Sequence, residues 1–469
     1  MRQSYPLAML VLTLAVSAAF TIADNRDRTS TNKRVATSSA SGAGAAASTT
    51  STEETTKQAL EPEAVAARIQ KYRTAEAVVT ILDAAGKPVA NQEVVVEQVR
   101  HKFLFGCVAF LVNSCPTPQL EKAYRSRFAD LFNYATLPFY HFQYEKEEGK
   151  PDVARLKAVA NWCRENGITP KGHPLCWTLT PAWMQNKTAQ EAERLTVART
   201  KREVAQFAGL VDIWDVVNEP TNAAKVGEGS PLGKLYALKA PAEIVGEMFA
   251  AARGANAKAT LVLNDFETTD KFVEVIQDSV ARGATIDVIG VQAHQHHGAW
   301  TPEVTWEIAQ RFAKLGKPVH FTETTILSGR PMEGNDYTTN RTDWNTTEEG
   351  EKEQAKHVAE FYTILFSHPA VEAITWWGLP DLDSWLGAPA GLIRKDMSPK
   401  PAYEALHRLI KKEWWTGPIE LKTDDEGKIR FRGFLGDYVI KSVVGQGAFV
   451  LPQAGKIEAT IKLTAERQK

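Results

Sequence analysis

The sequence of 469 residues has few cysteines and no marked excess of charge of either sign. Its four cysteines, Cys107, Cys115, Cys163 and Cys176, fit no zinc-binding spacing, and we expect them to be buried free thiols. The formal net charge is −1, which gives no electrostatic basis for binding nucleic acid or an anionic membrane. Nucleic-acid-binding functions are therefore not favoured.

Long apolar runs are scarce as well, and the one that stands out lies at the N-terminus. Residues 7–20 are apolar, follow Arg2 and precede small residues, which is typical of a secretory signal peptide, here assigned to residues 1–23. The alternative is an uncleaved membrane anchor, for which the run is short. We expect a secreted or periplasmic protein without membrane contact after signal cleavage.

The segments on either side of the central part predict a small accessory domain. Residues 24–60 are rich in Ser, Thr, Ala and Gly and predict a disordered linker. A helix and a β-hairpin are expected over 61–100, and short strands over 416–469. Neither piece has enough strands to be stable alone. Residues 82–96 and 423–441 resemble the split halves of an immunoglobulin-type module, which implies one immunoglobulin-like, all-β domain built from both segments.

The central residues 101–415 alternate short apolar strands with amphipathic stretches. Eight such pairs predict an α/β fold, the (β/α)8 TIM barrel. The expected strands are 102–110, 133–139, 169–177, 212–219, 260–266, 287–294, 318–325 and 373–379. In this fold the active site lies at the carboxyl ends of the strands, and many polar residues of this sequence gather there.

Two of the expected strands deliver a glutamate to that end of the barrel. One strand ends in Asn218-Glu219-Pro220, and the strand at 318–325 contains Glu323. A retaining glycosidase needs two such carboxyl groups, one to protonate the leaving oxygen and one to attack the sugar. We assign Glu219 as the acid, its pKa raised by burial and by the neighbouring negative charge, and Glu323 as the ionised nucleophile.

Six motifs resemble, in order, those of the glycoside hydrolase family 10 xylanases. They are GHPLCW (172–177), WDVVNEP (214–220), LNDF (263–266), GVQAH (290–294), TET (322–324) and WWGLPDLDSW (376–385). The resemblance runs over nearly all of residues 101–412. It implies a retaining endo-1,4-β-xylanase that cleaves xylan by double displacement.

The resemblance also implies roles for individual residues. Glu219 and Glu323 are the catalytic pair, Asn218 donates to the sugar 2-hydroxyl, and His294 fixes the orientation and charge of Glu323. The residues implied to bind substrate, or in one case to support the acid, are His173, Trp177, Gln292, Trp377 and Trp385.

The sequence departs from the family pattern on the non-reducing side of the expected cleft. Mostly aromatic or hydroxyl side chains replace polar sugar ligands there, and the acid expected two residues after the nucleophile is missing. The departures are Phe139, Tyr140, Gln143, Thr178, Thr180 and Thr325. The long polar loop 326–348 is predicted to lie over the cleft and to reshape or block one end of it. We expect these changes to alter sugar specificity and leave the mechanism intact.

Three other interpretations remain open at this point. The first is a related β-glycosidase of exo or altered sugar specificity, and the second is a carbohydrate-binding barrel without catalysis. The third is a metal-dependent hydrolase using His173, His294, His296 and His297. On the leading interpretation the partner is a polysaccharide or oligosaccharide, the chain is a monomer, and neither a metal nor another cofactor is required.

Overall fold

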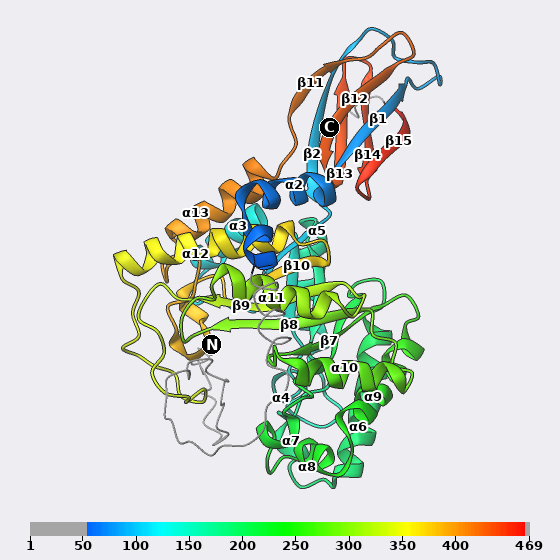
Figure 1. Cartoon of the computed structure of the whole chain (residues 1–469). Helices are drawn as coiled ribbons and strands as arrows, with labels where there is room; N and C mark the ends of the chain where they lie inside the picture. Colours follow the sequence, from blue (N-terminus) through cyan, green and yellow to red (C-terminus); the bar gives the residue numbers. More distant parts are fainter. Residues whose placement is uncertain (1–53, 465–469) are drawn as a thin grey trace, which may run out of the picture.

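A closed barrel of eight parallel strands forms the centre of the molecule, as the computed structural model shows for residues 54–464 (Figure 1). The strands neighbour one another in the order β10-β3-β4-β5-β6-β7-β8-β9. They are β3 (Leu104–Val108), β4 (Tyr134–Pro138), β5 (Thr169–His173), β6 (Ile213–Asn218), β7 (Thr260–Asp265), β8 (Val288–Gln295), β9 (Val319–Ile326) and β10 (Val371–Trp376). Each matches one predicted strand, so the TIM-barrel prediction is confirmed.

Helices surround the barrel and connect its strands. The longer ones are α3 (Pro118–Leu131), α5 (Val153–Glu165), α6 (Ala189–Gln206), α9 (Pro241–Ala255), α10 (Asp270–Ala281), α11 (Pro302–Ala313) and α12 (Glu348–Ser367), and α13 (Pro401–Arg408) follows β10. The short helices α4 (His141–Tyr144), α7 (Ala223–Val226) and α8 (Pro231–Leu238) lie in the loops after β4 and β6. Start positions follow local chemistry: Thr188 caps α6 in a capping box with Glu191.

A β-sandwich stands at one end of the barrel (Figure 1). One sheet holds β1 (Thr74–Leu82), β12 (Lys428–Phe434) and β15 (Gly455–Lys462), and the other holds β2 (Glu93–His101), β11 (Ile419–Lys422), β13 (Gly436–Ser442) and β14 (Gly445–Leu451). Alternate apolar residues of both sheets, such as Val79, Val96 and Tyr438, share one core. The predicted accessory β-domain, built from segments on both sides of the barrel, is therefore present.

The predicted hairpin of the N-terminal segment is wrong. β1 pairs with β12 and β15, whereas β2 pairs with β11 and β13, so the two strands lie in opposite sheets. The chain turns tightly after β1, with the N–H of Asp83 donating to the carbonyl of Lys87 at 2.8 Å, and then crosses to the other sheet. Both strands bury every second side chain. This pattern is the same whether two strands pair in one sheet or lie in facing sheets, so it could not distinguish a hairpin from the observed arrangement.

The predicted boundaries before the barrel also need correction. Helix α2 (Pro62–Arg73) belongs to the barrel because Val65 and Ile69 pack into the barrel core. Residues 54–60, assigned to the linker, are helical, consistent with the helix-forming Lys, Gln, Ala and Leu among them. The predicted signal peptide (1–23) and the rest of the linker lie outside the described residues.

The sandwich lies at the amino-terminal end of the barrel strands. Only two residues separate β2 from β3, so the sandwich joins the barrel where β3 begins. Arg73, buried between α2 and the barrel, donates to the carbonyls of Phe366 and His368 at 2.6 Å each and of Val371 at 2.7 Å. Since Val371 opens β10, this contact also lies at the amino end. The carboxyl ends of the strands therefore point away from the sandwich.

The thiols agree in large part with the expectation from the sequence. Cys107, Cys163 and Cys176 are buried free thiols, while Cys115 is only half-buried and departs from the prediction. Within residues 54–464, no helix has the length and apolar character needed to span a bilayer.

Replacing Arg73 by Met is expected to destabilise the protein. The substitution leaves three buried carbonyl groups without their charged donor, which costs about 2–4 kcal/mol of the free energy of unfolding. Urea denaturation of the variant and the wild type measures this loss. Lys71→Met, on the exposed side of the same helix, is the matched control, and an equal loss in both variants would contradict the role of Arg73.

Candidate active site

The candidate catalytic side chains meet at the carboxyl ends of strands β6 to β9. Asn218 ends β6 and Glu219 follows it, Gln292 and His294 lie on β8, and Glu323 lies on β9. These strands are successive neighbours in the barrel, so their ends form one continuous rim. Glu219 is only 9% exposed and Glu323 only 4%. The two carboxyl groups are thus held in a largely dry part of the barrel mouth.

The backbone at Glu219 adopts a left-handed conformation, with φ of +59°. A non-glycine residue rarely adopts this conformation and needs support from its surroundings. The N–H of Glu219 donates to the carbonyl of Asn264 at 2.8 Å, and the N–H of Thr221 donates to Oδ2 of Asp265 at 2.9 Å. Two adjacent residues at the end of β7 therefore hold the turn that carries the candidate acid.

Three side chains donate hydrogen bonds to the carboxyl group of Glu219. Nε1 of Trp177 lies 2.8 Å from Oε2, while Nδ2 of Asn218 and Nε2 of Gln292 each lie 3.0 Å from Oε1. The predicted support of Glu219 by Gln292 corresponds to one of these contacts. Asn218 and Trp177, predicted to meet the sugar, also hold the acid.

Glu323 is fixed by a separate set of donors. Nδ2 of Asn264 lies 2.8 Å from Oε1, and Nε2 of His294 lies 3.1 Å from Oε2. The same Asn264 nitrogen also donates to Oδ1 of Asn218 at 2.7 Å. The side chains of Asn218 and Asn264 therefore connect the two glutamates through continuous hydrogen bonds, which restrains their relative positions. The contact expected between His294 and Glu323 is present.

Burial raises the pKa of both glutamates, but their neighbours act in opposite directions. Burial, and then the charge of Glu323, raise the pKa of Glu219 to about 7. Burial also raises the pKa of Glu323 to about 7, against the lowering effect of His173 and Lys171. The charge of Glu323 raises the pKa of Glu219, whereas His173 and Lys171 lower the pKa of Glu323 more than Asp215 raises it, so the first proton of the pair is favoured on Glu219.

His294 is neutral in this environment. Burial, and then the nearby His173, lower the pKa of His294 to about 3. Oγ1 of Thr325 accepts from the N–H of Gln295 at 3.2 Å and lies 3.3 Å from Nδ1 of His294. The threonine hydroxyl can then donate to Nδ1, which leaves the Nε2 proton of His294 for Glu323. Thr325, which stands where the family pattern has an acid, thus contacts His294 without adding a charge.

A buried ion pair that the sequence analysis missed lies beneath Glu323. Lys171 on β5 and Asp215 on β6 are both fully buried, with Nζ 2.6 Å from Oδ2. Nδ1 of His173 donates to the same oxygen at 2.7 Å, which turns Nε2 toward Oε1 of Glu323 at 3.9 Å. Burial raises the pKa of Asp215, but Lys171 and His173 outweigh it and the net pKa is lowered. The sequence did contain one signal for this ion pair, because Lys171 and Asp215 are opposite charges on two neighbouring apolar strands.

Aromatic rings border the site on two sides. Trp377 packs edge-on against His173 at 5.2 Å and His294 at 5.9 Å between ring centroids. Trp385 lies 4.9 Å from His294 and is 38% exposed. Tyr140, a departure from the family pattern, contacts both His173 at 5.3 Å and Trp177 at 5.6 Å. It is a lining residue that was not among the predicted binding residues.

The other departures lie away from the carboxyl pair or are buried beside it. Phe139 is buried in the core against Phe207 and Trp214, and Gln143 is exposed at the surface. Thr178 and Thr180 are buried. Of the three residues expected to replace sugar ligands on the second strand, Tyr140 is therefore the one whose ring contacts the candidate site.

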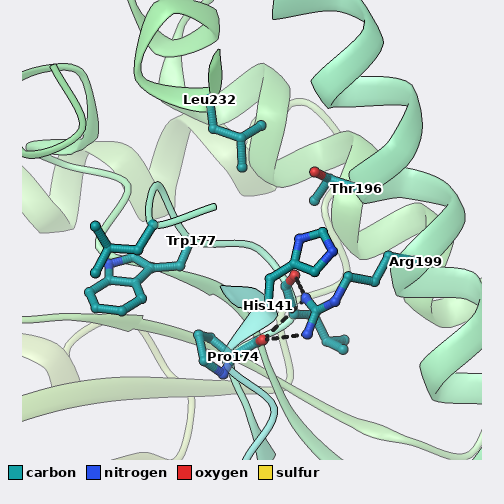
Figure 2. A pocket seen from close by; sticks show the side chains of 8 residues that line it. His141, Pro174, Trp177, Thr196, Arg199 and Leu232 are labelled. Atoms are coloured by element: carbon teal, nitrogen blue, oxygen red, sulfur yellow. Dashed lines mark hydrogen bonds between the residues drawn. The ribbon is translucent and has the colours of Figure 1, made fainter. Parts of the chain in front are cut away.

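A small cavity lies behind Trp177 and is lined by His141, Thr196, Arg199 and Leu232, among others (Figure 2). Its volume of about 10 Å³ is too small for a sugar. Arg199, which is buried, donates to the backbone carbonyls of Phe139 and Leu175 at the ends of two strands. Arg199 therefore supports the loop that carries Trp177, and the cavity is a small gap between that loop and α6.

The histidine-rich segment after β8 does not gather metal ligands. His296 and His297 face the aromatic rings of Trp385 and Tyr337. In the part of the chain that the structure describes, no group of three His, Cys, Asp or Glu side chains is placed to hold a metal ion.

Comparison with known proteins gives a consistent family. The model of Glycosyl hydrolase family 10 matches residues 116–409, more than half of the chain. A solved relative, xylanase 10B from Thermotoga petrophila in complex with xylobiose, has a TM-score of 0.57 and 24% identity, covering 66% of this chain and 95% of that one.

Two curated relatives differ in how much of this chain they match. Endo-1,4-beta-xylanase A from Cellvibrio japonicus is 30% identical over 279 residues, 53% of this chain and 45% of its own length. Anti-sigma-I factor RsgI6 from Acetivibrio thermocellus is 24% identical over 406 residues, 84% of this chain and 47% of its own length. The chain thus spans about half the length of these relatives, and the second match extends beyond the barrel.

Replacing Glu219 by Gln is expected to make stability less dependent on pH. The raised pKa means that folded wild-type protein binds more protons than the unfolded chain between pH about 4.5 and about 7, so its stability falls as pH rises through that range. Gln does not titrate, so the variant gains relative to wild type by about 1–3 kcal/mol at pH 8. Denaturant titrations at pH 4.5 and 8 measure the difference. An unchanged difference would contradict the raised pKa, and exposed Glu228→Gln is the control.

Replacing Thr325 by Asp is expected to raise the pKa of His294 from about 3 by about 1–3 units, because a carboxylate beside Nδ1 stabilises the imidazolium. Nuclear magnetic resonance titration of the ring nitrogens measures the shift. Thr325→Val removes the hydroxyl without adding charge and should leave the ring neutral. If the aspartate variant also stays neutral down to pH 4, the geometry inferred for this contact is wrong.

Proposed function

The chain belongs to glycosyl hydrolase family 10, and from this premise we propose that it is a retaining glycosidase that cleaves β-1,4-xylosidic bonds in xylan. The observation that carries the proposal is the buried carboxyl pair, Glu219 and Glu323, whose neighbours favour the proton on the first and the charge on the second. Xylan is the proposed substrate because several relatives bear the name endo-1,4-beta-xylanase.

The proposed reaction has two steps. In the first, the carboxylate of Glu323 attacks the anomeric carbon while Glu219 gives its proton to the leaving oxygen, forming a covalent glycosyl-enzyme. In the second, Glu219 takes a proton from water, and the water oxygen displaces Glu323, so the configuration at the anomeric carbon is retained. Loss of the negative charge at Glu323 in the first step lowers the pKa of Glu219, which suits its change from acid to base.

The neighbouring side chains have positioning roles in this scheme. Gln292 and Trp177 hold the carboxyl group of Glu219, and His294 and Asn264 hold that of Glu323. Asn218 is placed to exchange its bond to Glu219 for one to the sugar 2-hydroxyl. Trp377 and Tyr140 would contact the sugar at the scissile bond from the side of His173.

We place the reaction outside the cytoplasm because the apolar N-terminal run has the pattern of a secretory signal peptide. We expect the residues that replace the family's sugar ligands to determine whether the protein acts in endo or exo mode, and whether it prefers xylan or a related β-glycan. Tyr140 offers a ring face where a polar ligand is usual, which favours stacking over hydrogen bonding to that sugar unit.

A second candidate is a carbohydrate-binding barrel that senses polysaccharide without cleaving it. The specific observation in its favour is the match to a protein named an anti-sigma factor, which covers more of this chain than the match to the Cellvibrio xylanase. Against it stands the buried carboxyl pair, since a binding protein has no need of a protonated acid beside an ionised one.

Hydrolysis of linear xylan and of an aryl β-xylobioside distinguishes the candidates. We expect wild-type protein to release products from both substrates. Glu323→Gln should lower kcat at least 10³-fold on both, an order-of-magnitude estimate for losing the nucleophile. Glu219→Ala should lose xylan cleavage but form the covalent intermediate readily from the aryl substrate, because a good leaving group needs no proton.

The exposed variant Glu228→Gln serves as the matched control and should behave as wild type. Binding of xylo-oligosaccharides by wild-type protein with no turnover of either substrate would support the sensing barrel and overturn the proposal. Turnover of aryl glucoside or arabinoside in preference to xyloside would retain the mechanism and change the sugar.

A further inference from the structure

One face of the Trp385 indole is already covered by another ring of the same chain. Trp385 lies in a short 3-10 turn, Trp385–Gly387, after β10. Its ring stacks with that of Tyr337, with centroids 5.8 Å apart and planes inclined by 25°. Elsewhere the indole contacts the rings of His294 and His296, at 4.9 Å and 5.2 Å. The indole face that stacks on another aromatic ring can also stack on the apolar face of a sugar.

Tyr337 is held in this position by the loop between β9 and α12. Its hydroxyl lies 2.8 Å from Nε2 of His297. The loop is anchored on both sides of Tyr337, because the N–H of Met332 donates to the carbonyl of His296 at 2.7 Å and that of Arg341 donates to the carbonyl of Leu386 at 2.8 Å.

The same loop packs a small apolar cluster against the Trp385 segment. Met332 and Trp344 of the loop are buried with Leu386, Ala388 and Ala390. The loop therefore packs on the residues next to Trp385, and Tyr337 is a partly buried residue packed against this cluster. The long polar loop predicted to lie over one end of the cleft thus places an aromatic ring on Trp385.

His296 lies under this covered indole with its polar atoms unsatisfied. It is 1% exposed, and neither ring nitrogen has a hydrogen-bond partner among residues 54–464. Its ring neighbours are Trp385, Tyr337, Trp344 and His294. Burial and the adjacent histidines lower the pKa of His296 well below its usual value, so the ring is neutral and offers one donor and one acceptor. A sugar hydroxyl can satisfy either nitrogen.

We propose that Tyr337 and a distal sugar unit of the substrate compete for the same face of Trp385, and that His296 is the hydrogen-bonding partner uncovered when the sugar replaces the tyrosine. With Tyr337 in place, the cleft ends beside His294 and admits short substrates. This inference rests on the proposed glycosidase function and assigns the residues that set its substrate length. The tyrosine contacts the rings of Trp385, His296 and His297 and bonds to His297, and these are weak contacts of a kind that a sugar ring and its hydroxyls can replace.

The test compares kcat/KM for β-1,4-xylo-oligosaccharides of two to six units. In wild-type protein the value should rise little once the substrate reaches the covered indole. Tyr337→Ala should raise kcat/KM for the longest substrates about tenfold and leave the shortest unchanged, the ratio expected for one stacking contact. Tyr337→Phe keeps the ring and should resemble wild type. Asn335→Ala, an exposed change in the same loop, is the matched control.

The double variant Tyr337→Ala/His296→Leu tests the histidine. It should lose most of the gain on long substrates while keeping wild-type activity on the shortest, and thermal melting shows whether it is folded. An equal effect of Tyr337→Ala on all lengths, no effect on any length, or a full gain in the double variant would each overturn the inference.

Failure of the proposed function gives a different result from failure of this inference. If wild-type protein hydrolyses xylo-oligosaccharides but their length dependence is insensitive to Tyr337, this inference alone falls. Calorimetric titration of Glu323→Gln protein with xylohexaose provides a second measurement, in which Tyr337→Ala should raise affinity. Absence of both hydrolysis and binding in wild-type protein would overturn both proposals.

Discussion

Two carboxyl groups buried at one barrel mouth cannot both be ionised without a large electrostatic cost, and the rest of the site is arranged around this constraint. Glu219 and Glu323 are held by separate donors and connected through the amides of Asn218 and Asn264. Under Glu323, Asp215 pairs with Lys171 and orients His173, and His173 and Lys171 lower the pKa of Glu323 against the raising effect of burial. Glu219 lacks such a partner, so the proton is favoured there, and the proposed mechanism uses Glu219 as the proton donor and Glu323 as the nucleophile.

The fold keeps this arrangement rigid and separates it from the accessory domain. The candidate catalytic side chains Asn218, Glu219, His294 and Glu323 project from strand ends of a closed barrel, where neighbouring strands restrain one another. The sandwich joins at the opposite end, through the short connection from β2 to β3 and the carbonyl contacts of Arg73. A sandwich in that place can brace the barrel or meet a distant part of a polymer, but it does not extend the cleft at the catalytic end.

Much of this could be predicted from the sequence because the information is local. Each barrel strand has its own apolar pattern, and Asn218, Glu219 and Glu323 stand at strand ends within recognisable motifs. The contacts that were missed join distant segments whose local patterns are ordinary. Lys171 reads as a strand residue until Asp215 is placed beside it, and the alternation of β1 and β2 is the same in a hairpin as across two sheets. Tyr337 stands in a polar loop, so its stacking on Trp385 had no local signal.

Trapping the covalent intermediate identifies the carboxyl group that attacks the sugar. A 2-deoxy-2-fluoro xylobioside with a good leaving group slows hydrolysis of the glycosyl-enzyme, so the adduct can be found by mass spectrometry of the intact protein and its peptides. We expect one adduct per chain, on the peptide that contains Glu323 and on that side chain. An adduct on any other residue, or rapid turnover with inversion at the anomeric carbon, would contradict this expectation.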